Sequence, residues 1–254
     1  MAGFADRVAL VVPCFNEAAR LPVQEFLRAR LGRGRLELVF VDDGSTDATR
    51  GLLERIRAER PRETSLVVYD RNEGKAEAVR RGMLDALGRG ADTVGFWDAD
   101  LATPLSELPS FVEVLDENPD VDVVIGSRVK LMGRTVERLA WRHYLGRLFA
   151  MAASITLGLP VYDTQCGAKL FRATPLLADV FARPFLSRWV FDVEILARLL
   201  ALDPRGVNAT AASIYELPLH TWTDVRGSKV RSVDFARAAV DLARIRLAYP
   251  PRRP

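Results

Sequence analysis

The chain has 254 residues, a formal net charge of +3, 49% hydrophobic residues and 27% charged residues. These values are typical of a globular protein with one large core, and they exclude a chain that is disordered throughout. Lysine occupies only positions 75, 130, 169 and 229, so 32 of the 36 basic residues are arginine, which suits phosphate groups but also follows from a GC-rich genome. No basic cluster is interleaved with aromatic residues, so we expect no nucleic-acid partner.

The cysteines and the apolar runs bear on localisation. Cys14 and Cys166 have no spacing typical of a zinc site or a disulfide framework, which favours a reducing cytoplasm. Residues 1–7 lack the pattern of a signal peptide, and the longest uncharged apolar run, 148–162, is too short to cross a membrane. We therefore expect a cytoplasmic protein whose contact with a membrane, if it has one, is peripheral at the cytoplasmic face.

Apolar strands alternate with helices through the first half of the chain. The expected strands cover residues 8–12, 36–41, 66–69, 94–97 and 121–125. Four helices are expected, and the first begins at residues 13–17. The second follows Ser45 or Thr46 as its N-cap, and the third begins at residue 75. The fourth begins at residue 105, with Thr103 as N-cap and Pro104 at the first helical position. This alternation predicts an α/β fold with a mostly parallel central sheet and flanking helices.

The second half is less regular. Residues 134–159 are expected to form one or two helices, with Arg134, Arg138 and Arg142 on one face at i, i+4 and i+8. That face either holds a phosphate whose lipid tail lies along the following apolar segment, or is a solvated face beside a core helix. A strand is expected near 168–172, a helix from 190, a strand region at 214–222, and a basic amphipathic helix from about 232 to 249. This last helix is suited to an anionic lipid surface, although packing against the domain explains the same pattern.

Two carboxylates follow the fourth expected strand. Asp98 and Asp100 lie where ligands bind in open α/β sheets, beyond the carboxyl end of a strand. If strand geometry continues through the pair, both side chains point the same way. Converging carboxylate oxygens suit Mg²⁺ or Mn²⁺, with diphosphate oxygens and water as further ligands, whereas the alternative is a pair that only caps a loop. No Gly-x-Gly-x-x-Gly or Gly-Lys-Ser/Thr motif is present, which disfavours dinucleotide and P-loop sites.

Another acidic pair lies in the second half. Asp192 and Glu194 interrupt an apolar run at the start of an expected helix. Because burying an acid without a partner is costly, a role in a site is plausible, although first-turn acids are also favoured by the helix dipole.

Taken together, the motifs resemble those of inverting glycosyltransferases of family 2, which have the GT-A fold. The matching segments are residues 12–17 (VPCFNE), 41–47 (VDDGSTD), 72–75 (NEGK) and 98–100 (DAD), in the family's order. Three later segments are similar to the dolichyl-phosphate β-glucosyltransferase group: residues 163–171 (DTQCGAKLF), 191–194 (FDVE) and 222–229 (WTDVRGSK).

The resemblance implies an architecture and a set of site residues. It implies one catalytic domain over residues 1–249, with a nucleotide-sugar half (1–128), an acceptor half (129–249) and a tail (250–254). The implied donor-binding residues are Pro13, Phe15, Glu17, Asp42, Asp43, Lys75, Asp98, Gln165, Arg226, Ser228 and Lys229, the last three in a loop that closes over the diphosphate and excludes water. The implied metal ligands are Asp98 and Asp100, and the implied acceptor-phosphate residues are Arg128, Arg138 and Arg142. Asp98, Asp100, Asp192 and Arg128 are the implied catalytic residues, with Gln165, Asp192 and Glu194 around the sugar.

The implied reaction is metal-dependent transfer of glucose from UDP-glucose to a polyprenyl (dolichyl-type) phosphate. A different donor, GDP-mannose or a UDP-N-acetylhexosamine, and a soluble acceptor are alternatives within the family; an inactive nucleotide-sugar-binding protein is the alternative from another class. The chain departs from related enzymes at Ala102, where lipid-phosphate mannosyltransferases often have a metal-contacting glutamine. The membrane anchor of eukaryotic members has no counterpart here, which is the reason to expect peripheral membrane contact. The sequence predicts no oligomeric state.

Overall fold

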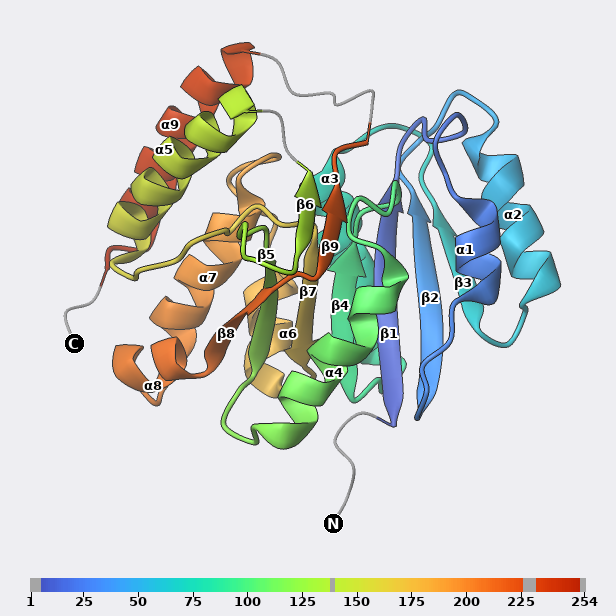
Figure 1. The fold of residues 1–254 in the computed structure, drawn as a ribbon, viewed down its shortest axis with the longest axis horizontal. Helices are drawn as coiled ribbons and strands as arrows, with labels where there is room; N and C mark the ends of the chain where they lie inside the picture. The colour runs from blue at the N-terminus through green and yellow to red at the C-terminus, as the bar shows by residue number, and fades with distance from the viewer. Residues whose placement is uncertain (1–5, 138–139, 226–231, 252–254) are drawn as a thin grey trace.

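The computed structural model describes residues 6–137, 140–225 and 232–251 (Figure 1), while the side chains of 137, 140–145 and 232–236 fall outside the description. Within these residues a seven-stranded sheet has the order β3-β2-β1-β4-β7-β5-β8. Its strands are β1 (Arg7–Cys14), β2 (Arg35–Asp42), β3 (Thr64–Val68), β4 (Thr93–Trp97), β5 (Val123–Ser127), β7 (Ala168–Arg172) and β8 (Ile214–Pro218). β7 runs antiparallel to its neighbours β4 and β5, and the other pairs are parallel. The predicted mostly parallel sheet is therefore confirmed.

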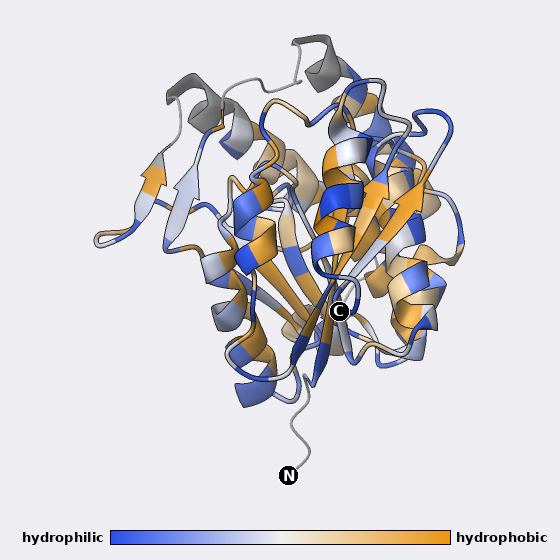
Figure 2. Cartoon of the chain, turned by 90° about the vertical axis from the view of Figure 1, so that its right-hand side faces the viewer, coloured by the Kyte–Doolittle hydropathy of each residue, from blue (hydrophilic) through white to orange (hydrophobic). Residues whose placement is uncertain are grey.

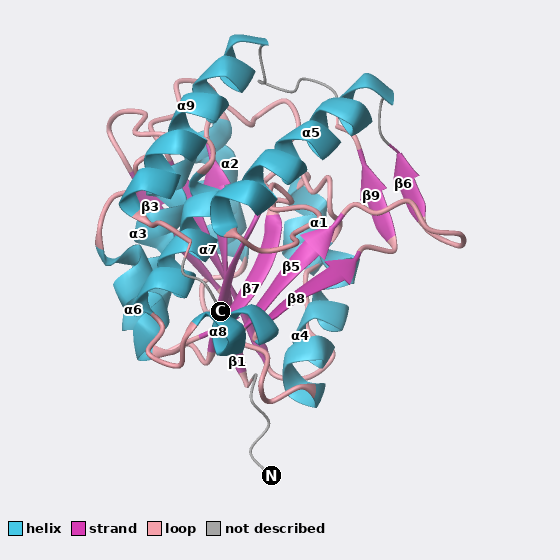
Figure 3. Ribbon diagram, turned by 90° about the vertical axis from the view of Figure 1, so that its left-hand side faces the viewer, coloured by secondary structure: helices cyan, strands magenta, loops and turns pink. Residues whose placement is uncertain are grey.

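Helices cover both faces of this sheet. One face carries α3 (Lys75–Gly88), α5 (Ala140–Leu157), α6 (Pro175–Ala182), α7 (Phe191–Leu202) and α9 (Ser232–Ala248). The other face carries α1 (Val23–Arg28), α2 (Thr49–Glu59), a 3-10 turn η1 (Leu105–Glu107) that leads into α4 (Leu108–Glu117), and a separate parallel pair of β6 (Thr135–Glu137) and β9 (Thr221–Thr223). The short α8 (Val207–Ala212) follows α7. α5 and α9 lie side by side (Figures 1 and 3).

Each face of the sheet has its own apolar core. In β1, Ala9 and Val11 pack on the α3 side, whereas Val8, Leu10 and Val12 pack on the α1 side, as the period of two requires. Figure 2 shows the strands as a hydrophobic interior with hydrophilic residues on the outer helices. Gly82 permits the close packing of α3, because a Cβ there would lie 2.4 Å from Val11 Cγ1. This packing fixes the amino end of α3, and with it Lys75, above the carboxyl ends of the strands.

The segment after the first strand is a turn, where a helix was predicted. Asn16 has φ of 51°, and its backbone N–H donates to Ser45 Oγ at 3.1 Å while its Oδ1 accepts from Thr46 N at 2.8 Å. Neither Ser45 nor Thr46 therefore caps α2. That helix begins later, at Thr49, whose N–H donates to Asp47 Oδ1 at 2.9 Å.

The predicted cap of the helix after β4 is also wrong. Thr103 precedes Pro104, which is itself the residue before η1, and no side-chain capping bond forms there. The carbonyl of Thr103 instead accepts from Trp97 Nε1 at 2.6 Å. The loop is thereby tied back to the strand that positions the acidic pair.

Residues 134–159 are a strand followed by a helix. Arg134 precedes β6, whose first residue donates to His220 O at 2.8 Å, and α5 begins only at Ala140. Arg134 and Arg142 therefore share no helix face, and Arg138 lies outside the described residues. The later predictions, of a strand near 168–172, a helix from 190 and a final helix from about 232, are confirmed.

No helix in the described part of the chain is long and apolar enough to cross a membrane.

Candidate active site

A cleft of about 720 Å³ opens at the carboxyl ends of β1, β2 and β4. Seven residues predicted for the donor or metal line it: Pro13, Phe15, Glu17, Asp43, Lys75, Asp98 and Asp100. A volume of this size is typical of small-molecule sites. The strand ends thus bring together residues that are up to 87 positions apart in the sequence, from Pro13 to Asp100.

The acidic pair lies in the turn that follows β4. The strand ends at Trp97, so the pair does not continue it, contrary to the expected strand geometry. The backbone N–H of Asp98 donates to Gly167 O at 3.0 Å, and Ala102 N donates to Asp100 Oδ1 at 3.2 Å. A Cβ at Gly167 would lie 1.9 Å from Asp98 Oδ2, so only glycine fits beneath that carboxylate.

Each carboxylate of the pair contacts a cation of the chain. Lys75 Nζ lies 2.5 Å from Asp98 Oδ1, and Arg20 NH1 lies 3.2 Å from Asp100 Oδ2. Arg20 also pairs with both oxygens of Glu17, at 2.5 and 2.8 Å. Arg20 is a residue that sequence reasoning missed, because no local pattern connects position 20 with position 100.

The ionisation of these groups reflects their partial burial. Burial and repulsion from Asp98 raise the pKa of Asp100. Burial alone would lower the pKa of Lys75, but the Asp98 and Asp192 carboxylates outweigh it, and the pKa is raised. Lys75 is therefore a stable cation at neutral pH.

The donor set suits a divalent metal only in part. Among the described residues no group of three or more His, Cys, Asp or Glu side chains converges to hold an ion. Asp98 and Asp100 supply oxygen ligands, and Ala102 adds none. Mg²⁺ fits such a site, since it is commonly bound through one or two carboxylates together with substrate phosphates and water.

Asp43 holds the turn that leads into α3. Its oxygens accept from the backbone N–H groups of Glu73 and Gly74 and from Asn72 Nδ2, each at 2.8 Å. Burial raises its pKa, although the two backbone donors act in the opposite direction. Asp43 thus faces the cleft and also fixes the backbone next to Lys75.

Asp42 does not line the cleft. Its side chain is fully buried, with Oδ1 accepting from Ser45 N at 3.1 Å and Oδ2 accepting from Arg50 Nε at 3.0 Å. These contacts stabilise the turn after β2, so the predicted contact of Asp42 with the donor is not what the structure supports.

Arg128 is engaged by an acid in the loop before β7. Its guanidinium pairs with both oxygens of Asp163, at 2.6 and 2.7 Å, and lies 5.3 Å from the ring centre of Trp222. Burial would lower the pKa of Arg128, but Asp163 outweighs it, so the pKa is raised. Arg128 would have to leave this bidentate pair to bind an acceptor phosphate.

Several predicted residues cannot be placed in the cleft. Arg138, Arg226, Ser228 and Lys229 lie outside the described residues, as does the side chain of Arg142 within α5. Gln165 is not among the residues that line this cleft, and its buried Nε2 has no hydrogen-bond partner in the described part of the chain.

Asp192 and Glu194 have different surroundings, because residues two apart on a helix point in different directions. Asp192 Oδ1 lies 2.5 Å from Nζ of Lys169, which is fully buried. Glu194 accepts from Leu186 N at 2.7 Å and pairs with Arg198 at 2.7 Å. Burial raises the pKa of Glu194. Glu194 therefore supports the segment before α7, and it is not among the residues that line the cleft.

The cysteine beside Gln165 is buried and is held as a neutral thiol at neutral pH. Burial, followed by the Asp163 carboxylate, raises the pKa of the Cys166 thiol to about 11.

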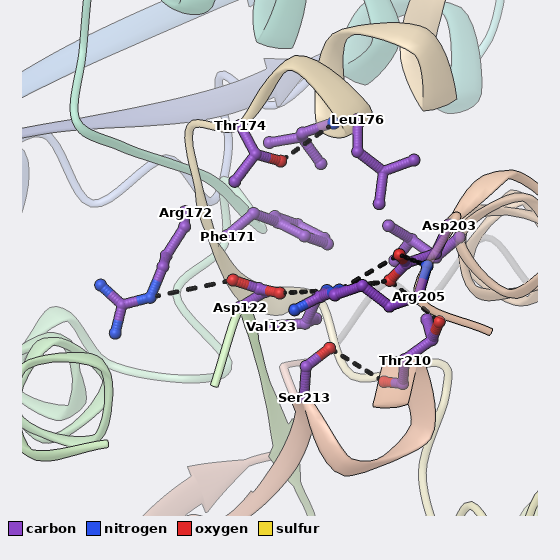
Figure 4. A pocket seen from close by; sticks show the side chains of 12 residues that line it. Asp122, Val123, Phe171, Arg172, Thr174, Leu176, Asp203, Arg205, Thr210 and Ser213 are labelled. Atoms are coloured by element: carbon purple, nitrogen blue, oxygen red, sulfur yellow. Dashed lines mark hydrogen bonds and ion pairs between the residues drawn. The ribbon is translucent and has the colours of Figure 1, made fainter. Parts of the chain in front are cut away.

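A smaller polar cavity lies near the amino ends of β5 and β8 and the carboxyl end of β7 (Figure 4). Asp122 lies between Arg172 and Arg205, at 4.0 and 2.5 Å, and Arg205 also contacts Asp203, which accepts from Thr210 Oγ1 at 2.9 Å. The cavity measures about 10 Å³, room for about one water molecule. This cluster is a structural clamp between α7, α8 and the sheet.

Sequence comparison then identifies the family. Residues 9–177 match the sequence model of glycosyl transferase family 2. The chain belongs to this family. It is therefore a glycosyltransferase, as its motifs predicted.

Relatives of this family 2 enzyme cover most of its length. The dolichyl-phosphate beta-glucosyltransferase of Saccharomyces cerevisiae is 32% identical over 95% of this chain and 75% of the relative. The Homo sapiens protein of the same name is 28% identical over 96% of this chain and 76% of the relative.

Solved structures confirm the GT-A fold. Glucosyl-3-phosphoglycerate synthase from Mycobacterium tuberculosis, in complex with Mn²⁺ and UDP-glucose, aligns with a TM-score of 0.68 at 16% identity, covering 98% of this chain and 80% of that chain. The same enzyme with Mn²⁺, UDP and glucosyl-3-phosphoglycerate aligns with a TM-score of 0.65 at 20% identity, covering 98% and 81%. At 16% and 20% sequence identity, this structural similarity shows a shared fold alone.

Proposed function

We propose that this family 2 glycosyltransferase transfers glucose from UDP-glucose to a polyprenyl phosphate with the aid of Mg²⁺ or Mn²⁺. The observation that carries the proposal is the pair Asp98 and Asp100, held by Lys75 and Arg20 in a cleft of about 720 Å³ at the strand ends. The relatives named dolichyl-phosphate beta-glucosyltransferase support the choice of sugar and acceptor. We assign the donor mainly to residues 1–128 and the acceptor mainly to residues 129–249.

The donor lies along the strand ends in this proposal. The nucleoside packs against Pro13 and Phe15 beside Asp43, all of which line the cleft. Asp98 and Asp100 would hold the metal, which when bound would stabilise the negative charge that develops on the departing UDP. Lys75 then turns from Asp98 toward the diphosphate, and Arg226, Ser228 and Lys229 are further proposed ligands of the diphosphate.

The acceptor is its own nucleophile. An oxygen of the phosphate attacks the anomeric carbon, a new C–O bond forms in line, and the bond from that carbon to UDP breaks, with the electron pair leaving on UDP. The configuration at the anomeric carbon inverts. Because the phosphate is already an anion at neutral pH, no base has to remove a proton, and positioning supplies most of the rate. Asp192 and Arg128 pair with Lys169 and Asp163, and none of these four residues is among those that line the cleft, so we propose that they act by positioning neighbouring segments.

We further propose that the enzyme binds peripherally to an anionic membrane at the cytoplasmic face. Apolar side chains of α5 and α9 are exposed on the outer surface of the helix pair: Leu148, Met151 and Ile155 on α5 and Val240 and Leu247 on α9, each 53–83% exposed. Exposed arginines, Arg244 and Arg246, lie on the same pair of helices. Apolar side chains beside arginines are typical of helices that bind anionic lipid surfaces.

Transfer of radiolabelled glucose tests the function. UDP-glucose and GDP-mannose are supplied in parallel, with a polyprenyl phosphate in detergent, with and without Mn²⁺ or Mg²⁺. We expect metal-dependent label in the organic phase from UDP-glucose. Label from GDP-mannose alone would contradict the donor, and metal-dependent release of UDP without organic-phase label would contradict the lipid acceptor.

Sedimentation with vesicles tests the membrane surface. We expect Ile155→Glu to weaken binding to anionic vesicles, whereas Leu202→Glu, at a similarly exposed leucine at the end of α7, leaves binding unchanged. Equal binding of Ile155→Glu and the unsubstituted chain would contradict the assignment of this surface.

A further inference from the structure

The final helix forms one wall of the cleft. Arg237, Asp241 and Arg244 of α9 line it, at the spacing i, i+4 and i+7 that places side chains on one side of a helix. Arg188, from the segment before α7, lines the same cleft. None of these residues belongs to the family motifs, and none was assigned to the site from sequence.

The contacts of this wall hold it in place. Asp241 Oδ2 accepts from Ser187 Oγ at 2.7 Å, and Asp241 Oδ1 lies 3.4 Å from Arg244 NH1. Arg188 Nε donates to the carbonyl of Glu73 at 2.8 Å. α9 is thereby joined to the segment before α7, and that segment is joined to the turn that precedes α3.

The charges of the cleft are divided between its two sides. On the strand side, four carboxylates accompany two cations: Glu17, Asp43, Asp98 and Asp100 with Arg20 and Lys75. On the α9 helix, Arg237 and Arg244 accompany a single carboxylate, Asp241, whereas Arg188 lies between the two sides because its Nε donates to Glu73 O, two residues before Lys75. The strand side therefore favours a metal ion, and the α9 side, with a formal excess of one positive charge and Arg188 next to it, favours an anion.

α9 also reaches the outer apolar surface. Ala238, Leu242 and Ile245 face the core, whereas Val240 and Leu247 are 53% and 83% exposed beside α5. The same helix thus contacts the cleft on one side and carries exposed apolar residues on another. A phosphate held in the cleft can leave an attached hydrocarbon chain along this outer surface.

We propose that Arg237 and Arg244, with Arg188, form the subsite for the acceptor's phosphate. The proposal rests on the proposed function and refines it. It differs from the expected set of Arg128, Arg138 and Arg142: Arg128 is not among the residues that line the cleft, and Arg138 and the side chain of Arg142 lie outside the described residues. Guanidinium groups suit this ligand because they donate charge-assisted hydrogen bonds to phosphate oxygens.

Calorimetric binding to the full chain, in the presence of UDP, tests the subsite without requiring turnover. The probes are geranyl phosphate, which has a phosphate on a short prenyl chain, and inorganic phosphate. We expect Arg237→Gln and Arg244→Gln each to weaken geranyl phosphate binding about tenfold or more, through loss of a charge-assisted hydrogen bond. The control is Arg55→Gln, because Arg55 is an exposed arginine on α2 that pairs with Glu59 and does not line the cleft, and this variant should bind geranyl phosphate as the unsubstituted chain does.

The affinity for UDP separates the acceptor's phosphate from the donor's diphosphate. We expect the affinity for UDP to stay within about twofold in all three variants. An equal loss of affinity for UDP, or unchanged binding of geranyl phosphate by both cleft variants, would overturn the subsite. If the cleft variants lose affinity for inorganic phosphate in parallel with their loss for geranyl phosphate, the result would support recognition of the phosphate group itself.

The binding of geranyl phosphate tests the subsite separately from the transfer of glucose, which tests the proposed function. A chain that binds geranyl phosphate through Arg244 but transfers no glucose would overturn the proposed function and support the subsite. Arg244 is 64% exposed, so its replacement keeps the test available if Arg237→Gln fails to fold.

Discussion

Asp98 and Asp100 are already paired with cations of the chain. Lys75 and Arg20 contact the oxygens that a divalent ion would use. A metal ion alone must therefore compete with two tethered cations. A bound nucleotide diphosphate weakens this competition, because it adds negative charge to the site and gives Lys75 another partner. Metal and nucleotide are expected to favour each other's binding.

Removal of Arg20 tests this competition. We expect Arg20→Gln to bind Mn²⁺ in the absence of nucleotide about three- to tenfold more tightly, since a positive charge near Asp100 is lost and the site is partly solvated. Titration of Mn²⁺ followed by electron paramagnetic resonance measures this affinity. Arg55→Gln is the control, because Arg55 pairs with Glu59 on α2. Weaker or unchanged Mn²⁺ binding by Arg20→Gln would contradict the competition.

Gly167 offers a second test at the residue scale. A methyl group there would lie 1.9 Å from Asp98 Oδ2, so Gly167→Ala must displace the carboxylate or the loop. We expect turnover to fall about 100-fold, since displacements of about 1 Å at a reacting site have effects of this size. Gly51→Ala is the control, because a Cβ at this exposed position in α2 meets nothing within 4 Å. Near-normal turnover of Gly167→Ala would show that the close contact does not position Asp98.

At the scale of elements, the strands and their polar ends were predictable because a buried parallel strand is a continuous apolar run. The connections were harder to predict. Residues 13–17 combine a proline, an asparagine and an acid, as a helix start does, but Asn16 bonds to the loop after β2, 29 and 30 residues away. The pair of Arg128 and Asp163 spans 35 residues, so sequence could not show that this arginine is already engaged. Which of these long-range contacts form depends on which loops meet at the edge of the sheet.

The clamp in Figure 4 gives a prediction for stability and pH. Hydrogen bonds from Arg205, together with Thr210, hold the pKa of Asp203 below its usual value. The unfolded chain therefore binds a proton at higher pH than the folded chain does, and the ionised Asp203 stabilises the fold above pH of about 4. We expect Asp203→Asn to lower the free energy of unfolding by about 1–3 kcal/mol at pH 7.

The pH dependence of this difference is the decisive part of the measurement. Urea unfolding from pH 7 to 3.5 measures the difference in free energy of unfolding between the unsubstituted chain and Asp203→Asn. This difference should be constant above pH of about 5 and should shrink below about 4, because Asp203 of the unfolded chain is then protonated and protonation begins to favour unfolding. The exposed Asp179, replaced by asparagine, is the control. A difference that does not depend on pH would mean that the charge of Asp203 contributes nothing.

At the scale of the whole molecule, the order of the motifs was enough to predict the GT-A fold, because the matching segments all follow strands of one sheet. Seven of the residues predicted for the donor and the metal line one cleft for the same reason. The α9 wall could not be predicted, because nothing in the sequence of residues 232–248 indicates that this helix packs beside Ser187 and closes the cleft. An amphipathic pattern predicts a helix and its apolar side, and the partner of its polar side is set by tertiary packing.

In the proposed function, the acidic pair in this cleft is required for glucosyl transfer to a lipid phosphate. The most direct measurement compares the unsubstituted chain with Asp100→Asn in transfer of labelled glucose from UDP-glucose to polyprenyl phosphate, at saturating Mn²⁺. Asparagine keeps the size of the side chain and removes its charge, so the fold is retained while a metal ligand is weakened. We expect the transfer rate to fall at least about 100-fold, equivalent to about 2.7 kcal/mol of transition-state stabilisation. Equal transfer by the two proteins would contradict this requirement.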